Sequence, residues 1–139
     1  MKFIVAIFAA ALLAGCTTPH QFATPDKTWQ THIGQLKYSD ATRTLIGDVV
    51  VQQRGAEDFQ LEFQKAGGIP LLTLREDATT ARAEGLFARG SWQGAPSAAP
   101  QHLRNWIALR ETFQKPTAGM ARKADFPADG QHFDFQFHR

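Results

Sequence analysis

The chain of 139 residues has one cysteine and almost no net charge, and each shortage excludes a class of protein. With Cys16 alone, no disulfide can form within the chain, so its stability has to come from an apolar core. Lysine and arginine number 15 against 13 aspartates and glutamates. We expect no nucleic-acid partner, because such proteins usually carry a basic stripe or patch. After residue 13 no apolar run approaches the ~20 residues that a membrane-spanning helix needs.

The first 16 residues follow the pattern of an export signal. Lys2 supplies a positive charge, residues 3–13 are apolar, and the box Leu13-Ala14-Gly15-Cys16 ends the stretch. This pattern resembles a bacterial lipoprotein signal peptide, which implies cleavage before Cys16 and a lipid attached to its sulfur. The alternative is an ordinary secretory signal with an incidental cysteine nearby. We favour lipidation, since it gives the lone thiol of an exported protein a role.

The sequence then divides into three parts. We expect residues 1–15 to be the signal peptide, residues 16–28 to be the lipidated N-terminus with an extended tether, and residues 29–139 to be one folded domain. Thr17 stands where an inner-membrane retention signal would resemble aspartate. The expected location is therefore the bacterial outer membrane, with a lipid-anchored domain that faces the periplasm.

From about residue 29 onward, apolar and polar residues alternate with the period of two that marks a half-buried strand. The pattern is clearest in residues 59–64, where three apolar residues share one face and three polar residues share the other. Short, turn-like connections separate the alternating segments, so we expect an antiparallel meander. The five expected strands cover residues 33–38, 43–53, 59–64, 71–76 and 79–87.

The spacing changes to that of a helix after Pro100, a residue that suits a first helical turn. Leu103, Trp106 and Phe113 recur at helical spacing up to about residue 114. A last alternating segment, residues 132–138, places three phenylalanines on one face. We therefore expect an α+β fold, in which a curved, mostly antiparallel sheet (an incomplete barrel) carries a helix lid on its apolar face.

The sequence offers little support for catalysis or metal binding. It has no His-Glu-x-x-His motif and no phosphate-binding glycine loop, and Gly90-Ser91-Trp92-Gln93-Gly94 resembles the Gly-x-Ser-x-Gly elbow of hydrolases only loosely. His132, Asp134 and His138 could share a strand face and bind a metal, but a solvated strand face produces the same pattern. We therefore expect no metal, no cofactor and no enzymatic activity.

The aromatic content, with 11 phenylalanines and three tryptophans, is large for a small domain. Core packing alone is one explanation. The other is a cavity between the sheet and its helix that holds an acyl chain. We expect such a cavity to be lined by Leu61, Phe63, Leu74, Phe87, Trp106 and Ile107.

Ile69 is the apolar tip of the loop Gly67-Gly68-Ile69-Pro70. A large apolar residue on a flexible loop either folds back into the core or contacts a membrane. Both alternatives fit the sequence, and Ile69 is our candidate for the membrane-contact residue of the site.

The order of elements is similar to that of the LolA/LolB group of lipoprotein carriers and receptors. The resemblance covers residues 34–107 and rests on the GxxxY start from Gly34 to Tyr38, the Ile69 loop between the third and fourth strands, and the helix core Pro100…Leu103-Arg104-x-Trp106-Ile107. The lipid-bearing Cys16 is similar to the receptor member, which is itself a lipoprotein. The chain departs from the group in having isoleucine where the receptor loop has leucine, and in offering only about one strand after the helix.

The resemblance implies binding of an acyl chain or a lipidated protein, in lipoprotein localisation or lipid transfer. The partners it implies are membrane lipid around the acylated Cys16, the acyl or lipoprotein ligand, and a periplasmic carrier protein. The alternative is a structural or interaction lipoprotein of the cell envelope, with a fully packed core and no ligand.

Overall fold

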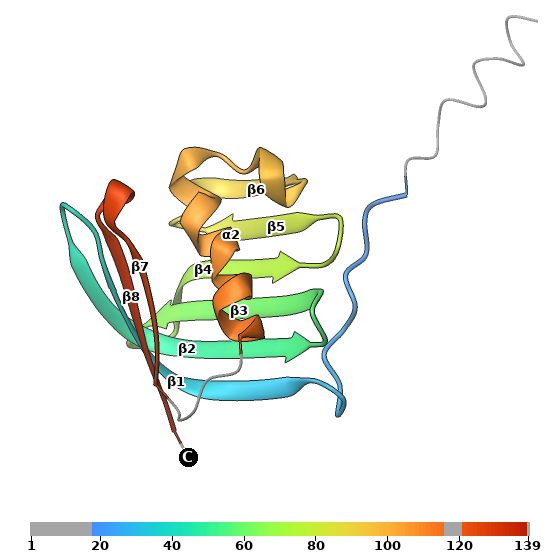
Figure 1. Cartoon of the computed structure of the whole chain (residues 1–139), viewed down its shortest axis with the longest axis horizontal. Coiled ribbons are helices and arrows are strands. Elements are labelled where there is room, and N and C mark those ends of the chain that lie inside the picture. The colour runs from blue at the N-terminus through green and yellow to red at the C-terminus, as the bar shows by residue number, and fades with distance from the viewer. Residues whose placement is uncertain (1–17, 116–120, 139) are drawn as a thin grey trace, which may run out of the picture.

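The computed structural model describes residues 18–115 and 121–138, which form one eight-stranded antiparallel sheet with a single α-helix (Figure 1). Six strands precede the helix: β1 (Gln30–Ser39), β2 (Thr44–Arg54), β3 (Asp58–Lys65), β4 (Ile69–Glu76), β5 (Ala81–Gly85) and β6 (Gly90–Gly94). The remaining elements are the 3-10 turn η1 (Pro96–Ala98), helix α2 (Gln101–Gln114), strand β7 (Ala121–Phe126), the 3-10 turn η2 (Pro127–Asp129) and strand β8 (Gln131–Phe137).

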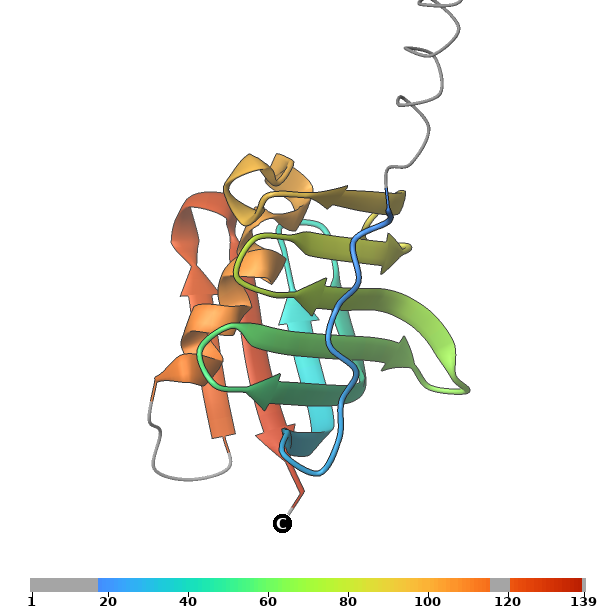
Figure 2. The same ribbon diagram turned by 90° about the vertical axis from the view of Figure 1, so that its right-hand side faces the viewer.

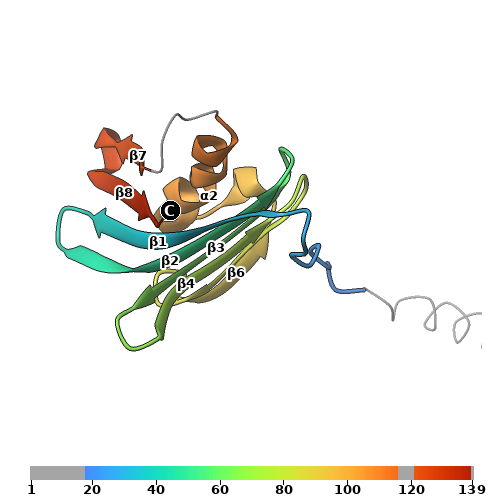
Figure 3. The same cartoon turned by 90° about the horizontal axis from the view of Figure 1, so that it is seen from below.

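The sheet has the strand order β6-β5-β4-β3-β2-β1-β8-β7. The last strand returns to the first, because β8 pairs with β1 and brings Phe135 opposite Leu36. Within the described residues the edge strands β6 and β7 do not pair with each other, so the sheet is open. Figure 3 shows that it is curved and that α2 and the β7–β8 pair lie on the same side of strands β1 to β6.

Two glycines allow the backbone to approach its neighbours where the long strands bend. A Cβ on Gly34 of β1 would lie 2.1 Å from the carbonyl oxygen of Gln136 in β8. A Cβ on Gly47 of β2 would lie 2.2 Å from the carbonyl oxygen of Gln64 in β3. Only glycine fits at such distances, so these two positions permit the curvature of β1 and β2.

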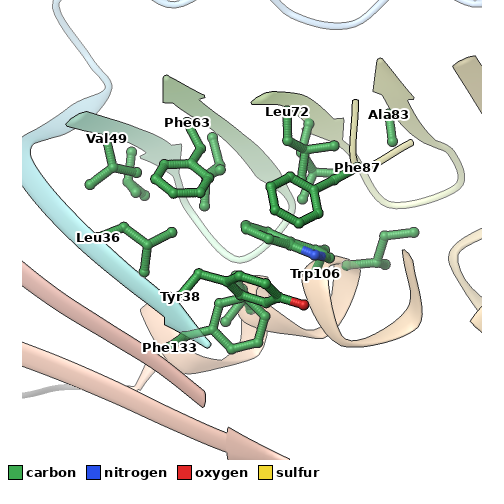
Figure 4. Packing of buried hydrophobic residues seen from close by; sticks show 14 of the residues in the cluster. Leu36, Tyr38, Val49, Phe63, Leu72, Ala83, Phe87, Trp106 and Phe133 are labelled. Carbon is green, nitrogen blue, oxygen red and sulfur yellow. The ribbon is translucent and has the colours of Figure 1, made fainter. Parts of the chain in front are cut away.

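The concave face of the sheet is apolar because inward-pointing residues alternate with polar ones along each strand. In β3 the inward residues Phe59, Leu61 and Phe63 are at most 1% exposed. Helix α2 contributes the other side of the core through its buried residues Leu103, Asn105, Trp106, Ile107, Leu109 and Phe113. The core is therefore a layer of side chains between α2 and the sheet (Figure 4).

The expected curved antiparallel sheet with one helix is confirmed, but the number of strands was wrong in two places. Segment 90–94 forms an edge strand in which only Trp92 packs against the core, so its hydrophobic signal is weak. After the helix the chain forms two strands instead of about one, since β7 precedes β8. Strand β7 has a single buried residue, Ala124, which explains why the alternation did not reveal it.

Trp106→Ala should lower the free energy of unfolding by about 3–5 kcal/mol, because the indole is completely buried in packed surroundings. Urea unfolding followed by circular dichroism measures the loss. Arg104→Ala is the matched control on the exposed side of the same helix, and it should change stability by at most about 0.5 kcal/mol. An unfolding midpoint that does not move in Trp106→Ala would contradict this account of the core.

Candidate functional site

The structure brings together the six residues expected to line a cavity. Leu61 of β3 lies directly opposite Leu74 of β4, and both are fully buried. The ring of Trp106 lies 5.9 Å from that of Phe63 and 5.2 Å from that of Phe87, measured between centroids. Ile107 completes the group at 6% exposure. All six residues therefore belong to one buried cluster, and their role as the lining of a ligand cavity stays a prediction.

These six side chains pack against other core residues on every side. Trp106 stacks on Tyr38 at 5.1 Å and meets the edge of Phe133 at 4.8 Å (Figure 4). All six residues are at most 6% exposed, so solvent has almost no access to them. Whether an acyl chain can enter the cluster stays a prediction, since the described conformation is closed.

Two hollows lie at the ends of α2, and polar side chains supply most of their walls. The hollow near the start of the helix has a volume of about 410 Å³ and includes Asp40, Arg89, His102 and Asp129 in its lining. The hollow near the end of the helix measures about 500 Å³ and is lined on one side by Phe113. Neither hollow is lined by any of the six cluster residues.

A hydrogen-bond network ties the start of α2 to the neighbouring hairpins. Asn105 Nδ2 donates to Asp129 Oδ2 at 2.8 Å and to Gln131 Oε1 at 2.6 Å. Gln131 Nε2 donates to the Tyr38 hydroxyl at 3.1 Å, and that hydroxyl donates to Asp40 Oδ2 at 2.9 Å. The network thus joins α2, the β7–β8 hairpin and the β1–β2 hairpin.

Tyr38 and Asp40, the last two groups of this network, each have one strongly favoured protonation state. Burial, reinforced by the hydrogen bond to Asp40, raises the pKa of Tyr38 to about 12. Burial alone would raise the pKa of Asp40, but hydrogen bonds from Thr42, Tyr38 and Arg43 outweigh it and lower this pKa to about 2. Tyr38 is therefore a neutral donor and Asp40 an ionised acceptor across the physiological range.

The other end of α2 covers a buried acid. Glu76, at the end of β4, is 2% exposed, and neither of its carboxylate oxygens has a hydrogen-bond partner among the described residues. Arg110 Nε lies 4.0 Å from Glu76 Oε1, while Arg110 Nη1 donates to the carbonyl oxygen of Asp77 at 2.8 Å. Burial raises the pKa of Glu76 to about 8, with Arg110 opposing the shift and Glu111 adding to it. Sequence analysis missed this group, because a glutamate at a strand end is normally exposed.

Ile69 is exposed, which decides between the two positions that the sequence allowed. It follows the β3–β4 turn, where Gly67 and Gly68 adopt φ angles of 92° and 81° that favour glycine. The side chain is 58% exposed. It does not fold back into the core, and its contact with a membrane stays a prediction.

Leu86 is a second exposed apolar residue at the same end of the sheet, and sequence analysis missed it. It lies in the β5–β6 turn and is 63% exposed, while the next residue, Phe87, points inward and is 6% exposed. The Phe87 N–H donates to the carbonyl oxygen of Leu71, two residues from Ile69 along β4. We call Ile69 and Leu86 together the apolar end of the sheet. The sequence feature that could have indicated an exposed Leu86 is the pair of glycines, Gly85 and Gly90, that flank its turn.

The other sequence candidates do not come together. Cys16 lies outside the described residues. His132 Nδ1 lies 2.8 Å from Asp125 Oδ1, whereas Asp134 faces Lys123 at 4.0 Å. Among residues 18–115 and 121–138, no three histidine, cysteine, aspartate or glutamate side chains are grouped to hold a metal ion. In the same residues, no helix has both the length and the apolar character needed to cross a membrane.

No family model matches this chain, and no curated protein matches its sequence.

The pKa of Glu76 makes stability depend on pH with a definite sign. Between about pH 4.5 and pH 8 the folded chain keeps a proton on Glu76 that the unfolded chain has lost, so the free energy of unfolding falls as pH rises. The expected slope from this group is on the order of 1 kcal/mol per pH unit. Glu76→Gln should remove that slope and stabilise the protein at pH 8.

Thermal unfolding at a series of pH values measures the effect. Glu84→Gln, an exposed change on the outward face of β5, is the control and should keep the slope of the unaltered chain. If the Glu76→Gln protein loses stability with pH as steeply as the control, Glu76 does not carry the raised pKa.

Proposed function

We propose that this protein is a lipid-anchored protein of the bacterial outer membrane that binds an acyl chain or a lipidated protein at the apolar end of its sheet. The observation that carries the proposal is the exposure of Ile69 and Leu86, at 58% and 63%, at the same end of strands β4 and β5 and next to the buried Phe87. Such contacts bind by removing methylene groups from water, at about 0.8 kcal/mol each. The resemblance to the LolA/LolB group supports the same function, with a periplasmic carrier protein as a partner.

The apolar end is continuous with the aromatic core, which gives an acyl chain a route inward. Leu86 points to solvent, and Phe87 beside it contacts the rings of Tyr38 and Trp106 at 5.1 and 5.2 Å. The guanidinium of Arg43 covers the ring of Phe87 at 4.5 Å. In this proposal Arg43 and Phe87 are the first groups that an entering chain displaces.

Helix α2 acts as the lid in this proposal. An acyl chain that lies along Leu61, Phe63, Leu74, Trp106 and Ile107 requires the helix to move away from the sheet, because these residues are closed to solvent when it is docked. The hydrogen bonds of Asn105 at one end of α2 and of Arg110 at the other hold the closed state.

The closed core favours one second candidate, an interaction lipoprotein that binds no lipid. In that case the packed aromatic cluster is purely structural, and the exposed residues dock another envelope protein. Native mass spectrometry of the full chain purified from membranes separates the two functions. A bound acyl ligand in addition to the covalent anchor supports lipid binding, and a stable protein that never carries one supports the second candidate.

Cys16→Ser should abolish both lipidation and cleavage, because the lipoprotein pathway modifies this sulfur before it cuts. The variant should stay full-length, and the unaltered chain should show the mass of a protein lipidated at residue 16. Mass spectrometry of the two purified proteins makes the comparison. Cleavage of the variant at the same position, with release as a lipid-free protein, would refute the lipoprotein assignment.

Ile69→Glu should weaken acyl binding without destabilising the fold, because the side chain is already in water. We expect an unchanged melting temperature and a loss of binding measured with a fluorescent fatty acid. Ile46→Glu is a closely matched control: Ile46 is 59% exposed, but it lies on the outward face of β2. Equal binding by the two variants would remove Ile69 from the site.

A further inference from the structure

The residues before β1 do not hang free of the domain. Residues 18–29, which we call the N-terminal strap, cross the strands of the sheet in Figure 2. His20 Nε2 lies 2.6 Å from Asp77 Oδ2 in the β4–β5 turn, and its Nδ1 lies 3.5 Å from Thr80 Oγ1. Phe22 is half-buried, with the His20 ring 4.7 Å away and the Arg82 guanidinium 5.5 Å away.

The other end of the strap is fixed as well. Asp26 Oδ1 accepts hydrogen bonds from the backbone N–H and the hydroxyl of Thr28, at 2.8 and 2.6 Å. Trp29 is 8% exposed, and the guanidinium of Arg54 lies 5.5 Å from its ring. From His20 onward, the segment that the sequence suggested as a tether is therefore attached to the sheet at both ends.

This attachment shortens the chain that is left to act as a spacer. If the lipid is on Cys16, three residues separate it from His20, and the four steps between the two Cα atoms reach at most ~14 Å when fully extended. An undocked chain from Cys16 to Trp29 would reach ~45 Å. The docked strap thus cuts the possible distance between the lipid and the domain about threefold.

The attachment of the strap also determines which end of the sheet lies near the lipid. His20 binds at the β4–β5 turn, while Ile69 begins β4 at the opposite end, about 23 Å away along the strand. The spacer is too short to bring the lipid to Ile69. The outward face between the two ends balances Glu62 and Glu84 against Arg75 and Arg82, so it lacks the basic excess that draws a protein surface onto an anionic bilayer.

We propose that the docked strap holds the domain with its β4–β5 turn toward the bilayer that carries Cys16, and with the apolar end directed away from that bilayer into the periplasm. This inference rests on lipidation of Cys16, proposed above. It makes the apolar end a surface for a lipid or lipidated protein that arrives from elsewhere, not for insertion into the anchoring membrane.

Fluorescence quenching in vesicles tests this orientation. The lipidated full chain is placed in vesicles of phosphatidylethanolamine and phosphatidylglycerol that contain a headgroup-attached quencher. Ala78→Cys in the β4–β5 turn and Ala66→Cys in the β3–β4 turn, both exposed alanines, provide a matched pair of labelling sites. The introduced thiol is the only one available, because the sulfur of Cys16 is blocked by its lipid. We expect loss of most of the fluorescence at position 78 and little loss at position 66.

Undocking the strap should abolish the difference. His20→Ala combined with Phe22→Ala removes the contacts with Asp77 and Arg82, so quenching at position 78 should fall toward the level at position 66. Gln21→Ala, an exposed change between them, is the control and should preserve the difference. Strong quenching at position 66, or an orientation unaffected by the double variant, would overturn the inference. A chain that carries no lipid by mass and does not float with vesicles would overturn the lipoprotein assignment instead, so the two failures are distinguishable.

Discussion

The contact of Trp106 with the sheet is the interaction on which the rest of the molecule depends. Its indole contacts Phe63 from β3, Phe133 from β8 and Tyr38 from β1. One side chain of α2 therefore contacts β1 and strands on both sides of it in the sheet. Since the edge strands do not pair with each other in the described part of the chain, no ring of backbone hydrogen bonds holds the sheet in its curve. Side-chain packing around the helix does so instead, and the concave shape depends on α2 being in place.

The two ends of α2 differ in how well their polar groups are satisfied. At the start of the helix, the amide of Asn105 has two acceptors and connects to a chain of further hydrogen bonds. At the other end, Glu76 is buried without a hydrogen-bond partner in the described residues, and Arg110 is 4.0 Å away. The buried, protonated carboxyl group of Glu76 gains hydration and can ionise when its cover is removed. Movement of α2 is therefore less costly at the Glu76 end, which is the end opposite Ile69 and Leu86.

The sequence was sufficient to predict features that repeat along the chain. Alternation placed Phe59, Leu61 and Phe63 on the buried face, and helical spacing placed Trp106 on the apolar face of the helix, where its ring lies 5.9 Å from that of Phe63. Features that depend on a single residue or on distant partners were missed. Strand β7 buries only Ala124. Glu76 is buried because helix α2, which begins more than 20 residues later, covers it. The exposure of Leu86 depends on how the β5–β6 turn is held against the start of β4, where the Phe87 N–H bonds to the carbonyl oxygen of Leu71. The attachment of His20 to Asp77 joins residues 57 positions apart, which no local pattern encodes.

The pairing of the last strand with the first has a consequence for the order in which the domain assembles. Gly34 lies opposite Phe137, so this pair closes a loop of about 100 residues, and the entropy of that closure must be overcome before the contacts of β8 stabilise anything. The strands from β1 to β6 join neighbours through short turns and can form early, whereas the central aromatic cluster lacks Phe133 and Phe135 until the end of the chain arrives. Folding should consequently be slow for a domain of this size and completed in a late, cooperative step. A chain cut short by a few residues at its C-terminus would leave part of the edge of β1 unpaired and prone to aggregation.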